Sequence, residues 1–144
     1  MRIYISGKIG EKVISEATRR KFNIIQEALT LEGHDVFNPT DTKWVESLKK
    51  QFPIDHATKP NGDKVSFYTY ALLRDLMVLA TCDAIYMLPG FLDSPGAKAE
   101  HAFAIASGLQ VYYDDELYRE GTLRGNSYQK NRFPWGERKD GKNV

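Results

Sequence analysis

Two acidic residues and one tyrosine are the side chains best suited to do chemistry in this chain. Glu100 lies in the second turn of a predicted helix that follows a Pro/Gly loop, and Asp75 lies in the helix predicted before it. Tyr4 lies in an apolar N-terminal stretch that is typical of a strand. Two carboxylates that face one cleft can break a glycosidic bond: one attacks the anomeric carbon, and the other handles the proton of the leaving group. A tyrosine hydroxyl beside them can orient a carboxylate.

Each of these residues also has an interpretation without chemistry. The pattern alone favours a solvated surface carboxylate for Glu100, since a helix start stabilises negative charge. Asp75 suits an ion pair with Arg74 or a nearby lysine, and Tyr4 suits simple packing in the core. Small residues flank Glu100 along its helix stripe and leave room for a ligand: Ala97, Ala104 and Ser107. The residue types alone therefore leave both interpretations open.

A second group of residues has the character of a phosphate-binding site. Hydroxyls, a cation and the free backbone N–H groups of a helix start are the groups that bind phosphate. The chain offers them in two loops, one after the first predicted strand and one before the helix of Glu100. The residues are Ser6, Gly7, Lys8, Ser94 and Gly96. The sequence contains neither a Walker A motif nor G-x-G-x-x-G, so mononucleotide kinase and Rossmann oxidoreductase functions lack their motifs.

We expect neither a metal nor a cofactor. His34, His56 and His101 do not have the spacing of metal ligands, and the single Cys82 gives no zinc site. Cys82 is better interpreted as a buried structural thiol than as a nucleophile. One cysteine forbids an internal disulfide and suits a reducing compartment. We find neither a signal peptide nor an apolar run of membrane-spanning length, and we therefore predict a cytoplasmic protein without a membrane contact.

The length and charge favour one compact domain with a small-molecule ligand. The chain has 144 residues, 42% of them hydrophobic, and a net charge of +1. This near-neutral charge makes nucleic acid an improbable partner, although basic and aromatic residues alternate near the end of the chain. We predict a domain over residues 1–118, followed by a polar, basic tail over residues 119–144 that is partly docked or disordered.

The hydrophobic pattern predicts alternating strands and helices. Strands are expected at 2–6, 34–37, 84–88 and 109–113, and helices at 13–32, 66–81 and 95–107. Residues 40–65 are the least regular part, with a short helix around Trp44, Val45 and Leu48. The sum is an α/β, flavodoxin/Rossmann-like sandwich around a mostly parallel sheet of four to five strands in the order 2-1-3-4. This order would bring the loop at Gly7 and the loop at 89–94 together at one cleft.

Three blocks of the sequence resemble the nucleoside 2-deoxyribosyltransferase-like superfamily, and most closely its small bacterial and phage branch, DUF4406. They are IYISG at 3–7, LRDL at 73–76 with CDAIYMLPG at 82–90, and SPGAKAEH at 94–101. With their connecting elements they cover roughly residues 1–113. The resemblance implies that Glu100 is the nucleophile, that Asp75 assists departure of the base, and that Tyr4 orients the nucleophile.

The resemblance also implies a preference for a phosphorylated substrate. Transferases of the superfamily that act on free nucleosides tend to place an Asp six residues before the Glu, whereas hydrolases of nucleoside 5′-monophosphates tend to have Ser. This chain has Ser94, with Asp93 immediately before it. The implied reaction is a double displacement at C1′ of a 2′-deoxynucleotide, without a metal.

Family members are commonly dimers or larger homo-oligomers in which a partner's C-terminal residues complete the pocket. Asn126 or Tyr128 is the candidate for that role here. Two other functions stay open. One is a module that binds a nucleotide without catalysis, and the other is a hydrolase of a different N-glycosidic bond, such as that of NAD.

Overall fold

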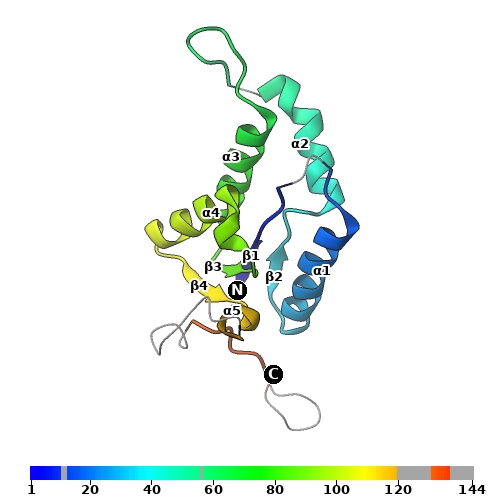
Figure 1. Ribbon diagram of the computed structural model, residues 1–144, viewed down its shortest axis with the longest axis vertical. Coiled ribbons are helices and arrows are strands. Elements are labelled where there is room, and N and C mark those ends of the chain that lie inside the picture. Colours follow the sequence, from blue (N-terminus) through cyan, green and yellow to red (C-terminus); the bar gives the residue numbers. More distant parts are fainter. Residues whose placement is uncertain (11–12, 56, 120–130, 137–144) are drawn as a thin grey trace.

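The computed structural model describes residues 1–10, 13–55, 57–119 and 131–136 (Figure 1). Strands and helices alternate along most of the chain. The strands are β1 (Arg2–Ser6), β2 (Asp35–Phe37), β3 (Ala84–Met87) and β4 (Gln110–Tyr113). The helices are α1 (Glu16–Leu31), α2 (Thr42–Asp55), α3 (Phe67–Leu79), α4 (Pro95–Ala106) and α5 (Asp115–Arg119), with a 3-10 turn η1 at Phe91–Asp93.

The four strands form one parallel sheet in the order β2-β1-β3-β4. Tyr4 on β1 pairs in register with Phe37 on β2 and with Ile85 on β3. β3 is buried along its whole length, as a central strand covered on both faces must be. The predicted α/β class, parallel pairing and strand order are confirmed.

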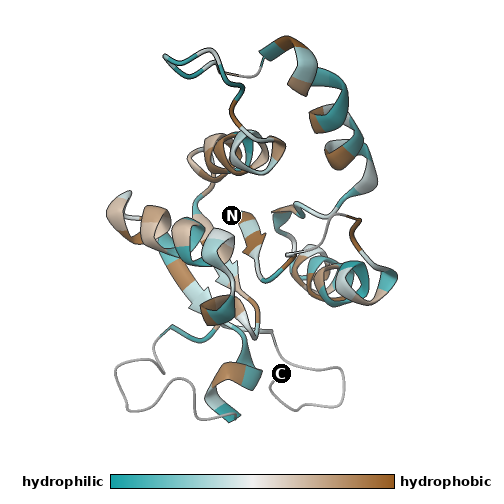
Figure 2. Cartoon of the chain, turned by 45° about the horizontal axis from the view of Figure 1, so that its top comes forward, coloured by the Kyte–Doolittle hydropathy of each residue, from teal (hydrophilic) through white to brown (hydrophobic). Residues whose placement is uncertain are grey.

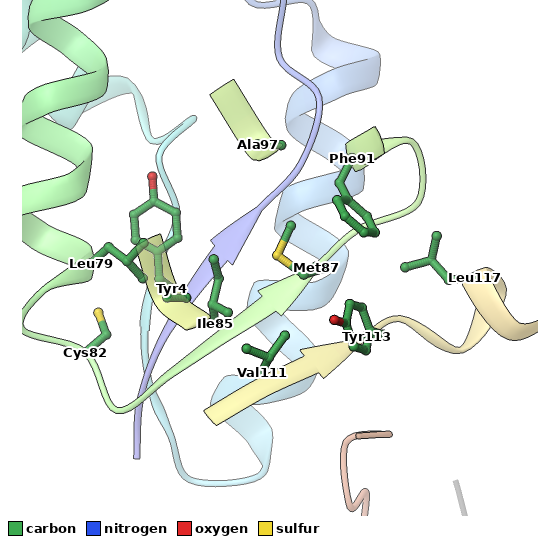
Figure 3. Packing of buried hydrophobic residues seen from close by; sticks show 11 residues of the cluster. Tyr4, Leu79, Cys82, Ile85, Met87, Phe91, Ala97, Val111, Tyr113 and Leu117 are labelled. Atoms are coloured by element: carbon green, nitrogen blue, oxygen red, sulfur yellow. The ribbon is translucent and has the colours of Figure 1, made fainter. Parts of the chain in front are cut away.

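Two hydrophobic clusters lie on opposite faces of this sheet. Figure 1 shows α1 on one side of the strands and α3 and α4 on the other. Figure 3 shows the cluster beneath α3 and α4, in which the ring of Tyr4 lies close to Leu79 and Ile85 and its hydroxyl points away from the strand. The second cluster joins Phe22 and Leu29 of α1 to Ile3 and Ile5 of β1. The alternation of side chains along β1 therefore sends Tyr4 toward α4 and its neighbours toward α1.

The least regular stretch of the sequence is more ordered than its composition predicts. α2 runs for 14 residues and includes Pro53 in its last turn, so the expected short helix was too short. The carboxylate of Asp41 accepts from the backbone N–H groups of Lys43 and Trp44 and caps the helix start. Only Leu48 of α2 is buried, and the ribbon of α2 is coloured as more hydrophilic than those of α3 and α4 (Figure 2). This weak apolar stripe explains why the hydrophobic pattern underestimates the length of the helix.

A short segment near the end of the chain packs on the α1 side of the sheet. Phe133 is buried in the second cluster with Tyr86, and Trp135 packs against it. The backbone of Arg132 forms a parallel β-bridge with Tyr113 of β4, and its guanidinium forms an ion pair with Asp115 at 3.7 Å. Residues 131–136 therefore contribute to the core, and they lie in the stretch 119–144 that we predicted as a partly docked or disordered tail.

Candidate active site

Glu100 lies in the second turn of α4, and its local sequence explains why the helix begins where it does. Ser94 is the N-cap, and its hydroxyl accepts from the backbone N–H of Ala97 at 3.2 Å. Pro95 occupies the first helical position, where a missing N–H costs nothing. The side chain of Glu100 is buried, with 6% of the residue exposed. The interpretation of Glu100 as a solvated surface carboxylate is therefore wrong.

Both oxygens of the Glu100 carboxylate accept hydrogen bonds from β1. The hydroxyl of Tyr4 donates to Oε2, and the hydroxyl of Ser6 donates to Oε1 at 2.7 Å. Tyr4 and Ser6 are two residues apart on one strand, so they share the face that α4 covers. These two bonds fix the carboxylate in place against the sheet.

Ser6 has a different partner from the one that we predicted. The sequence grouped it with phosphate-binding residues, but it is fully buried and its hydroxyl is engaged with Glu100. Side chains along a strand point alternately to its two faces, so the sequence already indicated that Ser6 shares a face with Tyr4. Ser6 thus belongs to the group of residues around the carboxylate.

Asp75 lies on α3, which packs against α4. Its Oδ1 accepts a hydrogen bond from the indole Nε1–H of Trp44 on α2, at 2.8 Å. Arg74, the ion-pair partner that the sequence suggested, instead lies 3.6 Å from Asp55 and donates to the hydroxyl of Tyr70. Sequence reasoning missed Trp44, because nothing local connects two side chains that are 31 residues apart.

Burial shifts the ionisation of both carboxyl groups. It raises the pKa of Glu100 to about 8, with the hydrogen bonds from Tyr4 and Ser6 opposing the shift and the charge of Asp75 adding to it. It raises the pKa of Asp75 to about 7, opposed by the Trp44 hydrogen bond and the charge of Arg74. Burial and the two carboxylates also hold the pKa of Tyr4 well above its usual value. Two interacting carboxyl groups that titrate near neutrality can divide the roles of nucleophile and acid.

The other predicted phosphate-binding residues lie in the two loops at the carboxyl ends of β1 and β3. A side chain at Gly7 would come within 3.0 Å of Leu88, so this glycine is required for packing. Lys8 is exposed. A side chain at Gly96, in the first turn of α4, would meet the hydroxyl of Tyr68 at 2.9 Å. Ser94 is buried at the same helix start.

Several predictions about the remaining residues can now be compared with the structure. Asn126 and Tyr128 lie outside the described residues. Cys82 is a buried free thiol, as expected, and His101 is packed against Phe91 and forms a 2.8 Å hydrogen bond with the hydroxyl of Tyr113. Among the described residues, no group of three His, Cys, Asp or Glu side chains could hold a metal ion. In that same part of the chain, no helix has both the length and the apolar character to cross a membrane.

Two surface hollows are lined by residues other than the two carboxyl groups. One of about 630 Å³ runs along α1, and one of about 280 Å³ lies beside Trp44, between Arg2 and Arg74. Neither is lined by Glu100 or Asp75. The candidate site is therefore defined by its hydrogen bonds and buried charge, and not by the volume of a hollow.

Comparison with known proteins supports both the family and the fold. The sequence profile described as a domain of unknown function, DUF4406, matches residues 1–113. No curated protein matches the sequence significantly. A solved structure of a 2-deoxyribosyltransferase from Bacillus psychrosaccharolyticus is similar over 96% of this chain and 87% of its own, with a TM-score of 0.54 and 15% sequence identity. This likeness confirms that the chain has the fold of a 2-deoxyribosyltransferase.

Proposed function

The chain belongs to the DUF4406 family, and, taking this together with the carboxylate pair, we propose that it cleaves or transfers the N-glycosidic bond of a 2′-deoxynucleoside 5′-monophosphate. The observation that carries the proposal is the setting of Glu100. Its buried carboxylate is held through both oxygens by Tyr4 and Ser6, close enough to Asp75 for the charges to interact. The fold shared with a 2-deoxyribosyltransferase supports the same chemistry.

In the proposed reaction, Glu100 attacks C1′ of the deoxyribose. A bond forms between a carboxylate oxygen and C1′ while the C1′–N bond breaks, and its electron pair leaves with the base. Asp75 in its neutral form donates a proton to the departing base. Water then releases deoxyribose 5-phosphate from Glu100, or a second base accepts the sugar. Tyr4 and Ser6 keep the nucleophile in position during both steps.

The start of α4 is the proposed site of the 5′-phosphate. Free backbone N–H groups at a helix start favour an anion. Ser94 supplies a neutral N-cap there, and Gly96, without a side chain, lets the hydroxyl of Tyr68 lie against the same turn. An aspartate at position 94 would repel a phosphate. Ser94 therefore supports a nucleotide substrate over a free nucleoside.

The test is an assay of base release from the four deoxynucleoside monophosphates and from the matching deoxynucleosides. We expect release from at least one monophosphate and loss of release in Glu100→Gln by at least a thousandfold, roughly the scale at which a lost nucleophile is felt. Glu46→Gln, which changes an exposed carboxylate on α2, is the matched control.

Four outcomes would count against the proposal. Release that survives Glu100→Gln excludes Glu100 as the nucleophile. Equal activity on nucleosides and monophosphates excludes the role given to Ser94. Nucleotide binding without any release would make the protein a binding module, and cleavage of NAD alone would make it a hydrolase of another N-glycosidic bond.

A further inference from the structure

Trp44 joins the candidate site from an element that is not expected to contribute to it. Its indole Nε1–H donates to Oδ1 of Asp75 at 2.8 Å, across the contact between α2 and α3. The indole ring meets the edge of Phe37 with 5.2 Å between centroids, and Phe37 stacks on Tyr4 at 5.3 Å. The guanidinium of Arg74 lies 5.8 Å from the indole centroid. Packing therefore fixes the ring that carries the donor.

An indole N–H can only donate, so it dictates which oxygen of Asp75 accepts. In a neutral carboxyl group, the carbonyl oxygen is the good acceptor and the hydroxyl oxygen carries the proton. A donor fixed at Oδ1 makes that atom the carbonyl oxygen and leaves the proton on Oδ2. Within the described part of the chain, no side chain forms a hydrogen bond with Oδ2.

We propose that Trp44 is a positioning residue that holds Oδ1 of Asp75 as an acceptor and so places the transferable proton of Asp75 on Oδ2. The inference rests on the proposed function, in which that proton goes to the departing base. The Oδ2–H bond breaks, a bond from that proton to the base forms, and the electron pair of the C1′–N bond ends on the base. Asp75 is left as a carboxylate, whose Oδ1 still accepts from Trp44.

The charged and titratable groups around Asp75 come from three elements. Arg74 on α3 favours the carboxylate form, whereas the charge of Asp75 itself raises the pKa of Glu100 on α4 and of Tyr4 on β1. Burial raises the pKa of Asp75 to about 7, and the Trp44 hydrogen bond opposes that rise. The neutral acid is thus well populated near pH 7, which is the form whose proton Trp44 would place.

The pairing can be tested in the free protein by nuclear magnetic resonance of the two indole N–H groups, Trp44 and Trp135. We expect the Trp44 resonance to shift with an apparent pKa near 7, the value of Asp75, and the shift to disappear in Asp75→Asn. Trp44→Phe assigns the resonance, and Trp135 is the internal control. A Trp44 resonance that does not move between about pH 5 and 9, or that moves equally in Asp75→Asn, would overturn the proposal.

The role in catalysis can be tested with two leaving groups. A purine methylated at N7 departs without needing a proton, whereas the unmodified purine needs one. We expect Trp44→Phe to lower kcat about tenfold or more for the unmodified deoxynucleotide and less than about threefold for the methylated one. Glu46→Gln, on the exposed surface of α2, should leave kcat unchanged for both leaving groups.

The two tests separate the inference from the proposed function. Equal losses for both leaving groups in Trp44→Phe would assign Trp44 a merely structural role and overturn the inference. If the wild-type protein releases base from none of the four deoxynucleoside monophosphates, the proposed function fails. The indole titration, which needs no substrate, then decides by itself whether Trp44 holds Asp75.

Discussion

The hydroxyl of Ser6 on β1 donates a 2.7 Å hydrogen bond to Oε1 of Glu100, a residue 94 positions later in the chain. This bond favours the ionised form of Glu100, as does the bond from Tyr4 to Oε2. Burial raises the pKa of Glu100 and so reduces the fraction of ionised carboxylate near neutral pH. The two hydrogen bonds oppose this effect. The strand beneath α4 thus orients the proposed nucleophile and limits the rise of its pKa.

The first prediction concerns these two donors. Ser6→Ala and Tyr4→Phe should each raise the pKa of Glu100 and reduce the carboxylate that is present at pH 7. We expect kcat to fall about tenfold to a hundredfold and the acid limb of the pH profile of kcat to move to higher pH. Ser107→Ala, an exposed serine at the end of α4, is the control. An unchanged acid limb in Ser6→Ala would show that its hydroxyl has no influence on the ionisation of Glu100.

The second prediction concerns phosphate selectivity at Ser94. Aspartate is as good an N-cap as serine, so Ser94→Asp should keep the start of α4 intact. Its negative charge should lower kcat/KM for a monophosphate at least about tenfold relative to the free deoxynucleoside. Ser94→Asn keeps the cap without the charge and should preserve the ratio. Equal losses on both substrates in Ser94→Asp would contradict a phosphate at this position.

The third prediction concerns stability and pH. The pKa of Glu100 is raised from 4.5 to about 8 and that of Asp75 from 3.8 to about 7. A raised carboxyl pKa means that the folded state prefers the proton, so its stabilising effect is complete below about pH 4 and is lost as the pH rises through 7 and 8. We expect Glu100→Gln and Asp75→Asn to flatten this decline.

Urea unfolding followed by circular dichroism between about pH 4 and 8.5 measures the effect. Glu46→Gln, on the exposed surface of α2, is the control for loss of a carboxylate. A decline of the same slope in wild type and Glu100→Gln would show that Glu100 is not protonated preferentially in the folded state.

The fourth prediction concerns the segment 131–136. Phe133 is 4% exposed and packs with its ring against Tyr112, His34 and Trp135. Phe133→Ala should lower the free energy of unfolding by about 3 kcal/mol, the usual cost of removing a buried aromatic ring. Leu31→Ala, at a position that is 89% exposed, should change it by less than about 0.5 kcal/mol. Equal denaturant midpoints for Phe133→Ala and Leu31→Ala would contradict the docking of segment 131–136.

Local signals in the sequence determine the scaffold. The periodic apolar residues specify the alternation of strands and helices, and this alternation leads to a parallel sheet with the order that the structure has. Ser94 and Pro95 specify the start of α4, and so they place Glu100 in the second turn of that helix. The elements and the cap depend on neighbours within a few residues, and the strand order follows from general rules of chain connection, so the sequence could predict both.

Tertiary packing decides which groups the two carboxyl groups meet. Asp75 accepts from Trp44, whereas the adjacent Arg74 turns to Asp55. Ser6 bonds to Glu100, because α4 covers the face of β1 that Ser6 shares with Tyr4. Each of these contacts joins residues far apart in the chain, and a displacement of one helix by a few ångströms would exchange one partner for another. The sequence therefore determines which residues can act, and only the packing of α2, α3 and α4 decides how their protons and charges are arranged.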